Sequence, residues 1–311
     1  MKSNLYAGVD IGSGSARLAI CEVNENKAKT KYFELFGHSL GNDNRNLGYF
    51  SDDSMQNAIE MFKSILDKCE IEDVEKVEFS ATEAIRAADN SKEFLEKVKT
   101  DLNIDIRILD EEEEATFAYL GATKLFDTNS KNVLVMDIGR GSVEFALGSA
   151  KLDKPTHYES HKIGTMVFKN RLDDKSNLQA SFNSIVTDVE NDILNTLEKW
   201  NVRFEQTDQI ISLGMSLFTY GYLNNYTEKE MVKAEGLELS LNEVKKYADE
   251  QLEFLEQGIC SKQQAGVISQ GDIPVLATLI GLMNATGLNK VMLGRTRIPQ
   301  GIALQLANKG A

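Results

Sequence analysis

Two short acidic glycine turns are the residues of this chain best suited to chemistry. Asp10-Ile-Gly12-x-Gly14-Ser15 returns about one domain length later as Asp137-Ile-Gly139-x-Gly141-Ser142. Each copy lies between two apolar runs, which predicts a strand, a glycine turn and a second strand. Glycine permits close backbone approach, so the amides of such a turn can converge on an anion. A lone turn could be an ordinary hairpin, but two matching copies indicate related halves that present phosphate-binding hairpins to one cleft.

Acidic residues could supply the rest of a phosphate chemistry. Asp10, Asp137 and Glu144 could coordinate Mg²⁺, which proteins hold with a few carboxylates and substrate phosphate oxygens. Four consecutive glutamates, Glu111 to Glu114, follow a predicted strand. They suit the positive end of a helix macrodipole, and one of them could equally activate a water for in-line attack. Arg86 could bind phosphate in a bidentate manner, although a solvated helix arginine is the plainer interpretation.

Composition limits the function classes. The chain has 311 residues, a length typical of two domains, with 48 acidic and 34 basic residues and a formal net charge of −14. This charge argues against a general binder of nucleic acid or of anionic membranes. The three cysteines are far apart and odd in number, which is typical of a reducing compartment. No signal peptide is predicted, and the longest apolar run, Val275 to Met283, is too short to span a membrane.

Several well-known motifs are absent from the sequence. Gly12-x-Gly14-x-x-Arg17 lacks the third glycine of a dinucleotide fingerprint and precedes a predicted strand, so a Rossmann site is rejected. The sequence has no Walker A motif and no cysteine that begins a Cys-x5-Arg phosphatase loop. His38, His157 and His161 lack metal-ligand spacing. Acidic residues and glycine turns are therefore the remaining candidates.

Strands and helices alternate in both halves, which predicts an α/β fold. The apolar patterns predict strands at 5–9, 18–21, 27–36, 74–81, 104–109, 133–136, 143–147, 209–213 and 290–293. They predict helices at about 55–69, 91–99, 111–124, 182–200, 240–255 and 274–285, and a last helix from about 300. Residues 37–48 are expected to form a polar loop, and 127–131 a linker between the halves.

The order of several motifs resembles the exopolyphosphatase/guanosine pentaphosphate phosphohydrolase family of the actin/hexokinase/Hsp70 ATPase superfamily. The turns look like the phosphate loops of that superfamily. Ala81-Thr-x-Ala-x-Arg86 is similar to the family's Ala-Thr-x-Ala-x-Arg segment, and the glutamate run with Ala115 resembles its Glu-Glu-Ala helix start. Asp137-Ile-Gly-Arg-Gly-Ser-Val-Glu144 resembles its Asp-x-Gly-Gly-Gly-Ser-Thr-Glu loop. The resemblance spans nearly the whole chain and corresponds to the short, two-domain form.

The resemblance implies two ribonuclease H-like (actin-like ATPase) domains facing a central cleft. The first would cover residues 1–124, with the C-terminal helix 301–311 as a candidate to complete it, and the second would cover 125–300. It also implies a cytoplasmic hydrolase that releases terminal phosphate from polyphosphate or guanosine pentaphosphate, using carboxylate-activated water and Mg²⁺ or Mn²⁺. The acidic chain favours short polyphosphate or a nucleotide over long chains. No nucleic-acid or membrane partner is expected, and a homodimer is possible.

The family's roles carry over residue by residue. Glu114 would be the catalytic base, with Glu113 as the alternative if the register is shifted by one. Asp137 and Glu144 would hold the metal, with Asp10 as a further ligand, and Arg86 would bind the terminal phosphate. The residues that would line the phosphate loops are Ser13, Gly14, Ser15, Gly139, Arg140, Gly141, Ser142 and Gly214.

Some positions depart from the family pattern and leave two alternatives open. Gly14 replaces an asparagine that supplies a side-chain ligand, and Arg140 replaces a loop glycine. Gly214-Met-Ser and the segment Arg297 to Gly301 also differ from the family's turns. A non-catalytic sensor of a guanosine tetraphosphate-like alarmone would fit these departures. An actin-like ATPase or small-molecule kinase is the third hypothesis.

Overall fold

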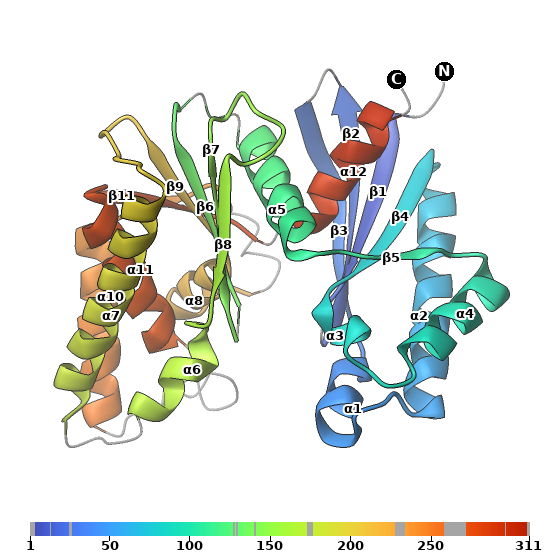
Figure 1. Cartoon of the computed structure of the whole chain (residues 1–311), viewed down its shortest axis with the longest axis horizontal. Coiled ribbons are helices and arrows are strands. Elements are labelled where there is room, and N and C mark those ends of the chain that lie inside the picture. Colours follow the sequence, from blue (N-terminus) through green and yellow to red (C-terminus); the bar gives the residue numbers. More distant parts are fainter. Residues whose placement is uncertain are drawn as a thin grey trace. The chain divides into compact units, whose positions relative to one another are not determined.

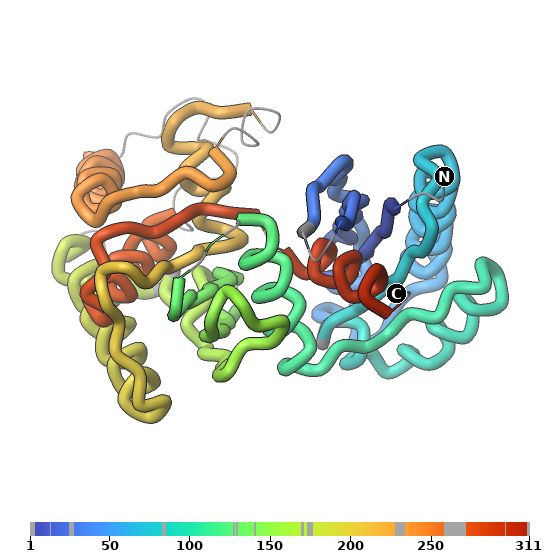
Figure 2. Tube along the Cα trace, turned by 90° about the horizontal axis from the view of Figure 1, so that it is seen from above, coloured from blue at the N-terminus to red at the C-terminus, as the bar shows by residue number. Residues whose placement is uncertain are grey.

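The chain divides into two compact units, drawn in sequence colours in Figures 1 and 2. The first comprises Met1–Asp127 and Arg297–Ala311, and the second comprises Thr128–Thr296. The computed structural model describes residues 4–12, 14–24, 27–126, 128, 130–139, 141–172, 177–227, 234–257, 272–295 and 297–309. Ser13 and Arg140, two of the predicted phosphate contacts, lie outside these residues. None of the helices within these ranges is long and apolar enough to cross a membrane.

The first unit contains a five-stranded sheet in its described part, in the order β3-β2-β1-β4-β5. The strands are β1 (Leu5–Ile11), β2 (Ser15–Asn24), β3 (Lys27–Gly37), β4 (Lys76–Ala81) and β5 (Ile106–Ile108). The first three strands are antiparallel neighbours, whereas β4 and β5 run parallel to β1. The carboxyl ends of β1, β4 and β5 therefore share one edge of the sheet, and this is where α/β folds place their sites.

Helices cover both faces of this sheet (Figure 1). They are α1 (Leu40–Leu47), α2 (Asp52–Ile71), α3 (Glu83–Arg86), α4 (Ser91–Leu102), α5 (Glu111–Leu125) and α12 (Ile298–Lys309). On one face, α2 and α4 form an aromatic core in which the ring of Phe62 contacts Phe79 of β4 at 5.5 Å and Phe94 at 6.3 Å. On the other face, α12 packs on β1 and β2 beside α5.

Close backbone approach allows the C-terminal helix α12 to complete the first unit. A Cβ atom on Gly8 of β1 would lie 2.0 Å from the carbonyl oxygen of Pro299, and one on Gly301 would lie 2.1 Å from that of Phe117. Only glycine fits at either position without a shift of the backbone. Figure 2 shows the result, with the red C-terminal helix lying beside the blue N-terminal strands.

The second unit repeats this arrangement of strands. Its described residues form a six-stranded sheet in the order β10-β11-β9-β6-β7-β8. The strands are β6 (Val133–Ile138), β7 (Val143–Gly148), β8 (His157–His161), β9 (Gln209–Gly214), β10 (Glu238–Ser240) and β11 (Lys290–Leu293). β6, β7 and β8 are antiparallel neighbours, and β9 runs parallel to β6 on its other side. The repeated glycine turns thus occupy equivalent hairpins, β1–β2 and β6–β7.

The helices of the second unit enclose the larger apolar core. They are α6 (Thr165–Lys169), the 3₁₀ helix η1 (Asn170–Leu172), α7 (Leu178–Lys199), α8 (Met215–Leu223), α10 (Leu241–Glu256) and α11 (Asp272–Thr286). Alternate residues of β6 and β7, among them Met136, Ile138 and Phe145, pack into this core with α7 and α11. Ser240 and Glu243 form the capping box predicted at the start of α10.

Most predicted elements are confirmed, and the loop predicted at 37–48 is wrong. Residues Leu40–Leu47 form α1, which ends at Gly48 in the left-handed conformation at φ +81°. The segment contains three asparagines, an aspartate and a glycine, so its helix propensity is poor, but burial of Leu40 fixes it against the core. The helix α8, directly after the third glycine turn, and the short strand β10 were not predicted either.

Candidate active site

A pair of acidic side chains is the centre of the candidate site in the second unit. Asp137 on β6 and Glu144 on β7 are directly opposed in the antiparallel ladder, so their side chains leave the same face of the sheet. Both are half-buried. Burial, and then the charge of Asp137, raises the pKa of Glu144 above its usual range. Two neighbouring carboxylates of this kind are stabilised by a bound cation.

Two hydroxyls hold one oxygen of the Glu144 carboxylate. Ser142 Oγ donates to Glu144 Oε1 at 2.5 Å, and Ser160 Oγ of the adjacent strand β8 donates to the same oxygen at 3.2 Å. Ser142 lies in the glycine turn itself. The turn therefore positions a metal-ligand candidate in addition to any contact it makes with phosphate.

Backbone hydrogen bonds fix the glycine turn of the second unit. The Gly139 amide donates to the carbonyl oxygen of Ser142 at 3.0 Å, and the Gly164 amide donates to that of Gly141 at 3.3 Å. The Thr165 amide, at the start of α6, donates to the Gly139 carbonyl at 3.1 Å. The Gly139 amide therefore closes the turn and is already used in a backbone hydrogen bond.

Gly214 lies against the Asp137 carboxylate. It has φ +72°, and a Cβ atom there would lie only 2.4 Å from Asp137 Oδ1. Gly214 is also the N-cap of α8, so the positive end of that helix begins beside the carboxylate. The sequence predicts a phosphate contact for Gly214. In the structure, its lack of a side chain leaves room for the Asp137 carboxylate.

The equivalent hairpin of the first unit has the opposite charge pattern. Asp10 is paired across the ladder with Arg17, whose Nη1 donates to Asp10 Oδ2 at 2.7 Å. Asp10 is fully buried, and its Oδ1 has no hydrogen-bond partner within the described residues. The arginine therefore already neutralises Asp10, which the sequence predicts as a further metal ligand. The turn is closed as in the second unit, by the Gly12 amide and the Ser15 carbonyl oxygen at 3.0 Å.

Arg86 ends the short helix α3 that follows β4. Its side chain is exposed, and it makes no hydrogen bond or ion pair with the parts of the chain that the structure describes. An exposed guanidinium of this kind can bind a phosphate without first leaving another partner.

The glutamate run divides into residues with different tasks. Glu113 forms a capping box with Asp110, accepting its amide at 3.2 Å and donating its own amide to Asp110 Oδ1 at 2.9 Å. Glu113 also accepts from Arg107 Nη2, and Arg107 Nη1 binds Glu78 on β4 at 3.1 Å. Glu113 therefore stabilises the start of α5, whereas the half-buried Glu114 takes no part in the capping box.

A model of the Ppx/GppA phosphatase family matches residues 20–284. The chain belongs to this family. A bifunctional 3-dehydroquinate synthase/phosphatase of Fusobacterium nucleatum is 36% identical over 154 residues, or 47% of this chain and 23% of that protein. A guanosine-5'-triphosphate,3'-diphosphate pyrophosphatase of Aliivibrio fischeri is 27% identical over 203 residues, or 64% of this chain and 39% of that protein. The chain thus spans two fifths or less of the length of these relatives.

Solved Ppx/GppA structures share the fold over nearly the whole chain. The Aquifex aeolicus family member matches with a TM-score of 0.83 at 23% identity, covering 98% of this chain and 97% of that one. An exopolyphosphatase from Cytophaga hutchinsonii matches with a TM-score of 0.71 at 19% identity, covering 97% of each chain. The predicted α/β class and the two-domain actin-like ATPase fold are confirmed.

Sequence reasoning missed three contacts of this candidate site. Arg17 occupies the place of Glu144 in the first hairpin, and aligning the two turns would have revealed this opposition of charge. The capping box of Glu113 was also readable, since an Asp three residues before a Glu at a helix start is its signature. The contact of Ser160 with Glu144 had no local signal, because it depends on the register between β7 and β8.

Proposed function

We propose that the chain is a phosphoanhydride hydrolase that releases the terminal phosphate of polyphosphate or guanosine pentaphosphate. The observation that carries this proposal is the Asp137–Glu144 pair, opposed on β6 and β7 beside a glycine turn in a Ppx/GppA chain. Phosphoryl transfer depends on positioning the substrate and on stabilising its negative charge. A divalent cation can supply this stabilisation, and a carboxylate pair is suited to hold one.

The carboxylate pair suits Mg²⁺ or Mn²⁺. Hard divalent cations take oxygen ligands, and Mg²⁺ is commonly held by one or two carboxylates together with substrate phosphates. The raised pKa of Glu144 reflects burial beside the negative charge of Asp137, and a cation would remove that penalty. When bound, the metal would neutralise charge on the phosphate oxygens. Two carboxylates are enough for this, and the described residues contain no group of three or more His, Cys, Asp or Glu side chains that could hold a metal ion.

Both units carry groups that would suit phosphate binding. In the first unit, the turn with Gly14 and Ser15 follows β1, and Arg86 follows the neighbouring parallel strand β4. Because β1 and β4 end at the same edge of the sheet, Arg86 and the turn belong to one end of the unit. In the second unit, Gly141 and Ser142 would bind phosphate, with Ser142 also holding Glu144.

Glu114 would activate the attacking water. A half-buried carboxylate in the first turn of a helix can accept a proton from water or orient it for in-line attack. Glu113, the alternative base, already accepts the Asp110 amide and the Arg107 guanidinium. These hydrogen bonds leave Glu113 less able to accept a proton.

The substrate class is argued from the relatives and from charge. One relative is a guanosine-5'-triphosphate,3'-diphosphate pyrophosphatase, and one similar structure is an exopolyphosphatase. The formal net charge of −14 would repel a long polyanion more than a short one. Short polyphosphate or a guanosine pentaphosphate is therefore the preferred substrate.

The test is phosphate release with Mg²⁺ from short polyphosphate, long polyphosphate, guanosine pentaphosphate and ATP. Glu114→Gln should abolish release while ligand binding persists. Glu112→Gln is the matched control, because Glu112 is exposed in the same helical turn. Full activity of Glu114→Gln would refute its assignment as the base, and loss of activity only in Glu113→Gln would shift the assignment by one residue.

A non-catalytic alarmone sensor is the second candidate, favoured by the geometry at Gly14. Where the family carries an asparagine, this chain has a glycine, and no atom lies within 4 Å of a Cβ atom built there. The turn thus lacks a side-chain ligand and has room for one. Guanosine tetraphosphate binding by calorimetry without turnover of any substrate would support the sensor, and Gly14→Asn should then restore hydrolysis.

A further inference from the structure

The strand β8 has two functional faces. Within the described sheet it is an edge strand that pairs only with β7. Ser160 is exposed on the face that carries Glu144, its direct partner across the ladder. Glu159 and His161, on either side of Ser160, point to the opposite face, as the alternation of a strand requires. Whatever holds these two residues therefore also fixes the position of Ser160.

Ser160 restrains the carboxylate of Glu144, the proposed metal ligand. Its Oγ donates to Glu144 Oε1 at 3.2 Å, the same oxygen that accepts from Ser142 Oγ at 2.5 Å. With both hydroxyls on Oε1, rotation about the last side-chain torsion of Glu144 is restricted. The other oxygen, Oε2, is then the one directed toward a cation, and none of the described side chains donates a hydrogen bond to it.

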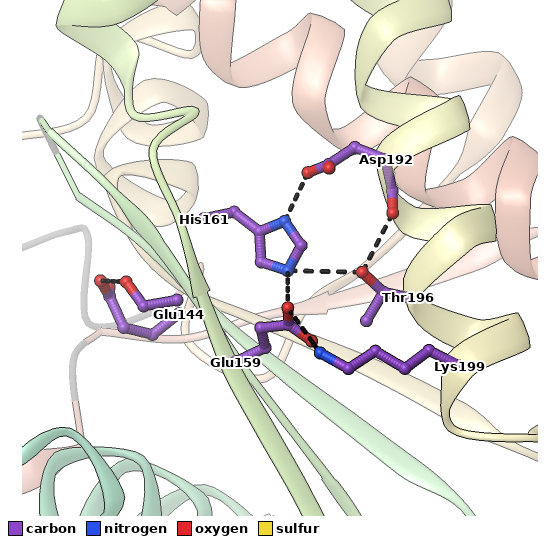
Figure 3. A network of polar contacts seen from close by, with 7 residues as sticks. Glu144, Glu159, His161, Asp192, Thr196 and Lys199 are labelled. Atoms are coloured by element: carbon purple, nitrogen blue, oxygen red, sulfur yellow. Dashed lines mark hydrogen bonds and ion pairs between the residues drawn. The ribbon is translucent and has the colours of Figure 1, made fainter.

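The opposite face of β8 is anchored to α7 by a polar network (Figure 3). His161 Nδ1 lies 2.5 Å from Asp192 Oδ2, and His161 Nε2 lies 3.4 Å from Thr196 Oγ1. Lys199 Nζ donates to both carboxylate oxygens of Glu159, at 3.0 and 3.1 Å. The three helix residues lie on one face of α7, as their spacing of four and three requires.

The contacts of His161 and Glu159 with α7 hold β8, which has a neighbouring strand on one side only in the described sheet. An edge strand has hydrogen bonds along one side only, so within the described sheet the backbone of β8 is hydrogen-bonded to β7 alone. The ring of His161 also packs edge-on against Phe145 at 5.1 Å, and Phe145 is the residue next to Glu144 on β7. The network therefore fixes both strands that carry the Glu144–Ser160 contact.

We propose that Ser160 is a positioning residue for the metal-binding carboxylate of Glu144, and that the His161–Asp192 pair anchors β8 to keep it in place. This inference rests on the proposed function, since it takes Glu144 as a metal ligand. Ser160 touches neither metal nor substrate. It acts by fixing which carboxylate oxygen a divalent cation meets.

The test is a titration of the full chain with Mn²⁺, in which electron paramagnetic resonance measures how much Mn²⁺ is bound. Removing a residue that orients a metal ligand typically costs about 10- to 100-fold in metal affinity. Because Ser142 still holds the same oxygen, Ser160→Ala should raise the dissociation constant by about tenfold, at the lower end of that range. Ser160→Thr retains the hydroxyl and suits a strand, so its affinity should stay within about twofold of wild type. At saturating Mn²⁺, the KM for short polyphosphate should be unchanged in Ser160→Ala.

A second pair of variants tests the anchor. His161→Gln should weaken Mn²⁺ binding in the same direction as Ser160→Ala, although it is on the far face of the sheet. His157→Gln is the matched control, because His157 lies on the same strand and the same face but stacks on Trp200 at 5.2 Å. Its Mn²⁺ affinity should equal that of wild type.

The outcomes separate the two proposals. Equal Mn²⁺ affinity of wild type and Ser160→Ala, together with lost binding in Glu144→Gln, would overturn the positioning role and leave the proposed metal site intact. Equal affinity of wild type and Glu144→Gln would overturn both. Weakened binding in Ser160→Ala that Ser160→Thr does not restore would also contradict the inference, since the hydroxyl would then not be the active group.

Discussion

Removing the charge of Glu144 should stabilise the metal-free protein. Glu144 and Asp137 are directly opposed on neighbouring strands, and both are half-buried. Their mutual repulsion opposes folding whenever both are ionised and no cation is present. In Glu144→Gln this repulsion is absent, and the amide oxygen can still accept from Ser142 and Ser160.

The size of this stability gain follows from the distance between the two carboxylates. Directly opposed side chains have Cβ atoms about 5 Å apart, and two charges at that distance repel by about 3 kcal/mol at an effective dielectric constant of about 20. Weakening two charge-assisted hydrogen bonds offsets about 1–2 kcal/mol of this. The net gain of about 1–2 kcal/mol should raise the melting temperature by about 2–8 °C, for a unit of this size.

The pH dependence of this gain has a definite sign. The folded-state pKa of Glu144 is raised above its ordinary value of 4.5, first by burial and then by Asp137. Below pH 4.5 the carboxyl is protonated in both the folded and the unfolded state, so ionisation imposes no penalty. The penalty grows as the pH rises from 4.5 through the raised pKa. The stability difference between Glu144→Gln and wild type should thus be largest above the raised pKa and fade toward pH 4.5.

Scanning calorimetry measures both effects. In EDTA at pH 7, Glu144→Gln should melt above wild type. On addition of Mn²⁺, the melting temperature of wild type should rise, because ligands that bind the folded state stabilise it, whereas that of the variant should not. A variant that melts below wild type in EDTA, or one that keeps the full Mn²⁺-dependent rise, would refute the reasoning.

Three further predictions concern the neighbouring residues. Glu113→Ala should lower the free energy of unfolding by about 1 kcal/mol, because no side chain then completes the capping box, and kcat should be unchanged. A fall in kcat without loss of stability, in denaturant titration and phosphate assays, would contradict this. Gly214→Ala should cost about 1–3 kcal/mol, because residues other than glycine rarely adopt its backbone conformation at φ +72°. It should also weaken Mn²⁺ binding by displacing Asp137, so retained affinity in an Mn²⁺ titration would count against that contact. Arg17→Met should lower the free energy of unfolding by about 3–5 kcal/mol, because it leaves Asp10 buried without its ion pair. In urea unfolding, adding Asp10→Asn should recover part of this loss. An unaltered urea midpoint in the single variant would show that the ion pair does not stabilise the fold.

The sequence predicted most of the strands and helices because their signals are local. The two hairpins were readable from apolar runs around paired glycines, and the long helices from their apolar spacing. The helix Leu40–Leu47 was not, because its own residues favour a loop and only burial of Leu40 against the core decides its conformation. Segments that tertiary packing stabilises against their intrinsic propensity escape a reading of local patterns.

The candidate site was predictable to a similar extent. Asp137 and Glu144 are separated by one tight turn, so their opposition across the ladder follows from the motif itself. The contact of Ser160 with Glu144 depends on strand register, and that of His161 with Asp192 depends on how a distant helix packs. Both contacts join residues far apart in the sequence, so they leave no periodic signal in it.

The most direct test of the hydrolase proposal is the fate of oxygen in the released phosphate. The purified chain would be incubated with Mg²⁺ and short polyphosphate or guanosine pentaphosphate in ¹⁸O-labelled water, and the phosphate analysed by mass spectrometry. Attack of water on the terminal phosphorus predicts one ¹⁸O atom in each phosphate released, with both label and phosphate lost in Glu114→Gln. Absence of released phosphate from wild type, or phosphate without the label, would contradict the account.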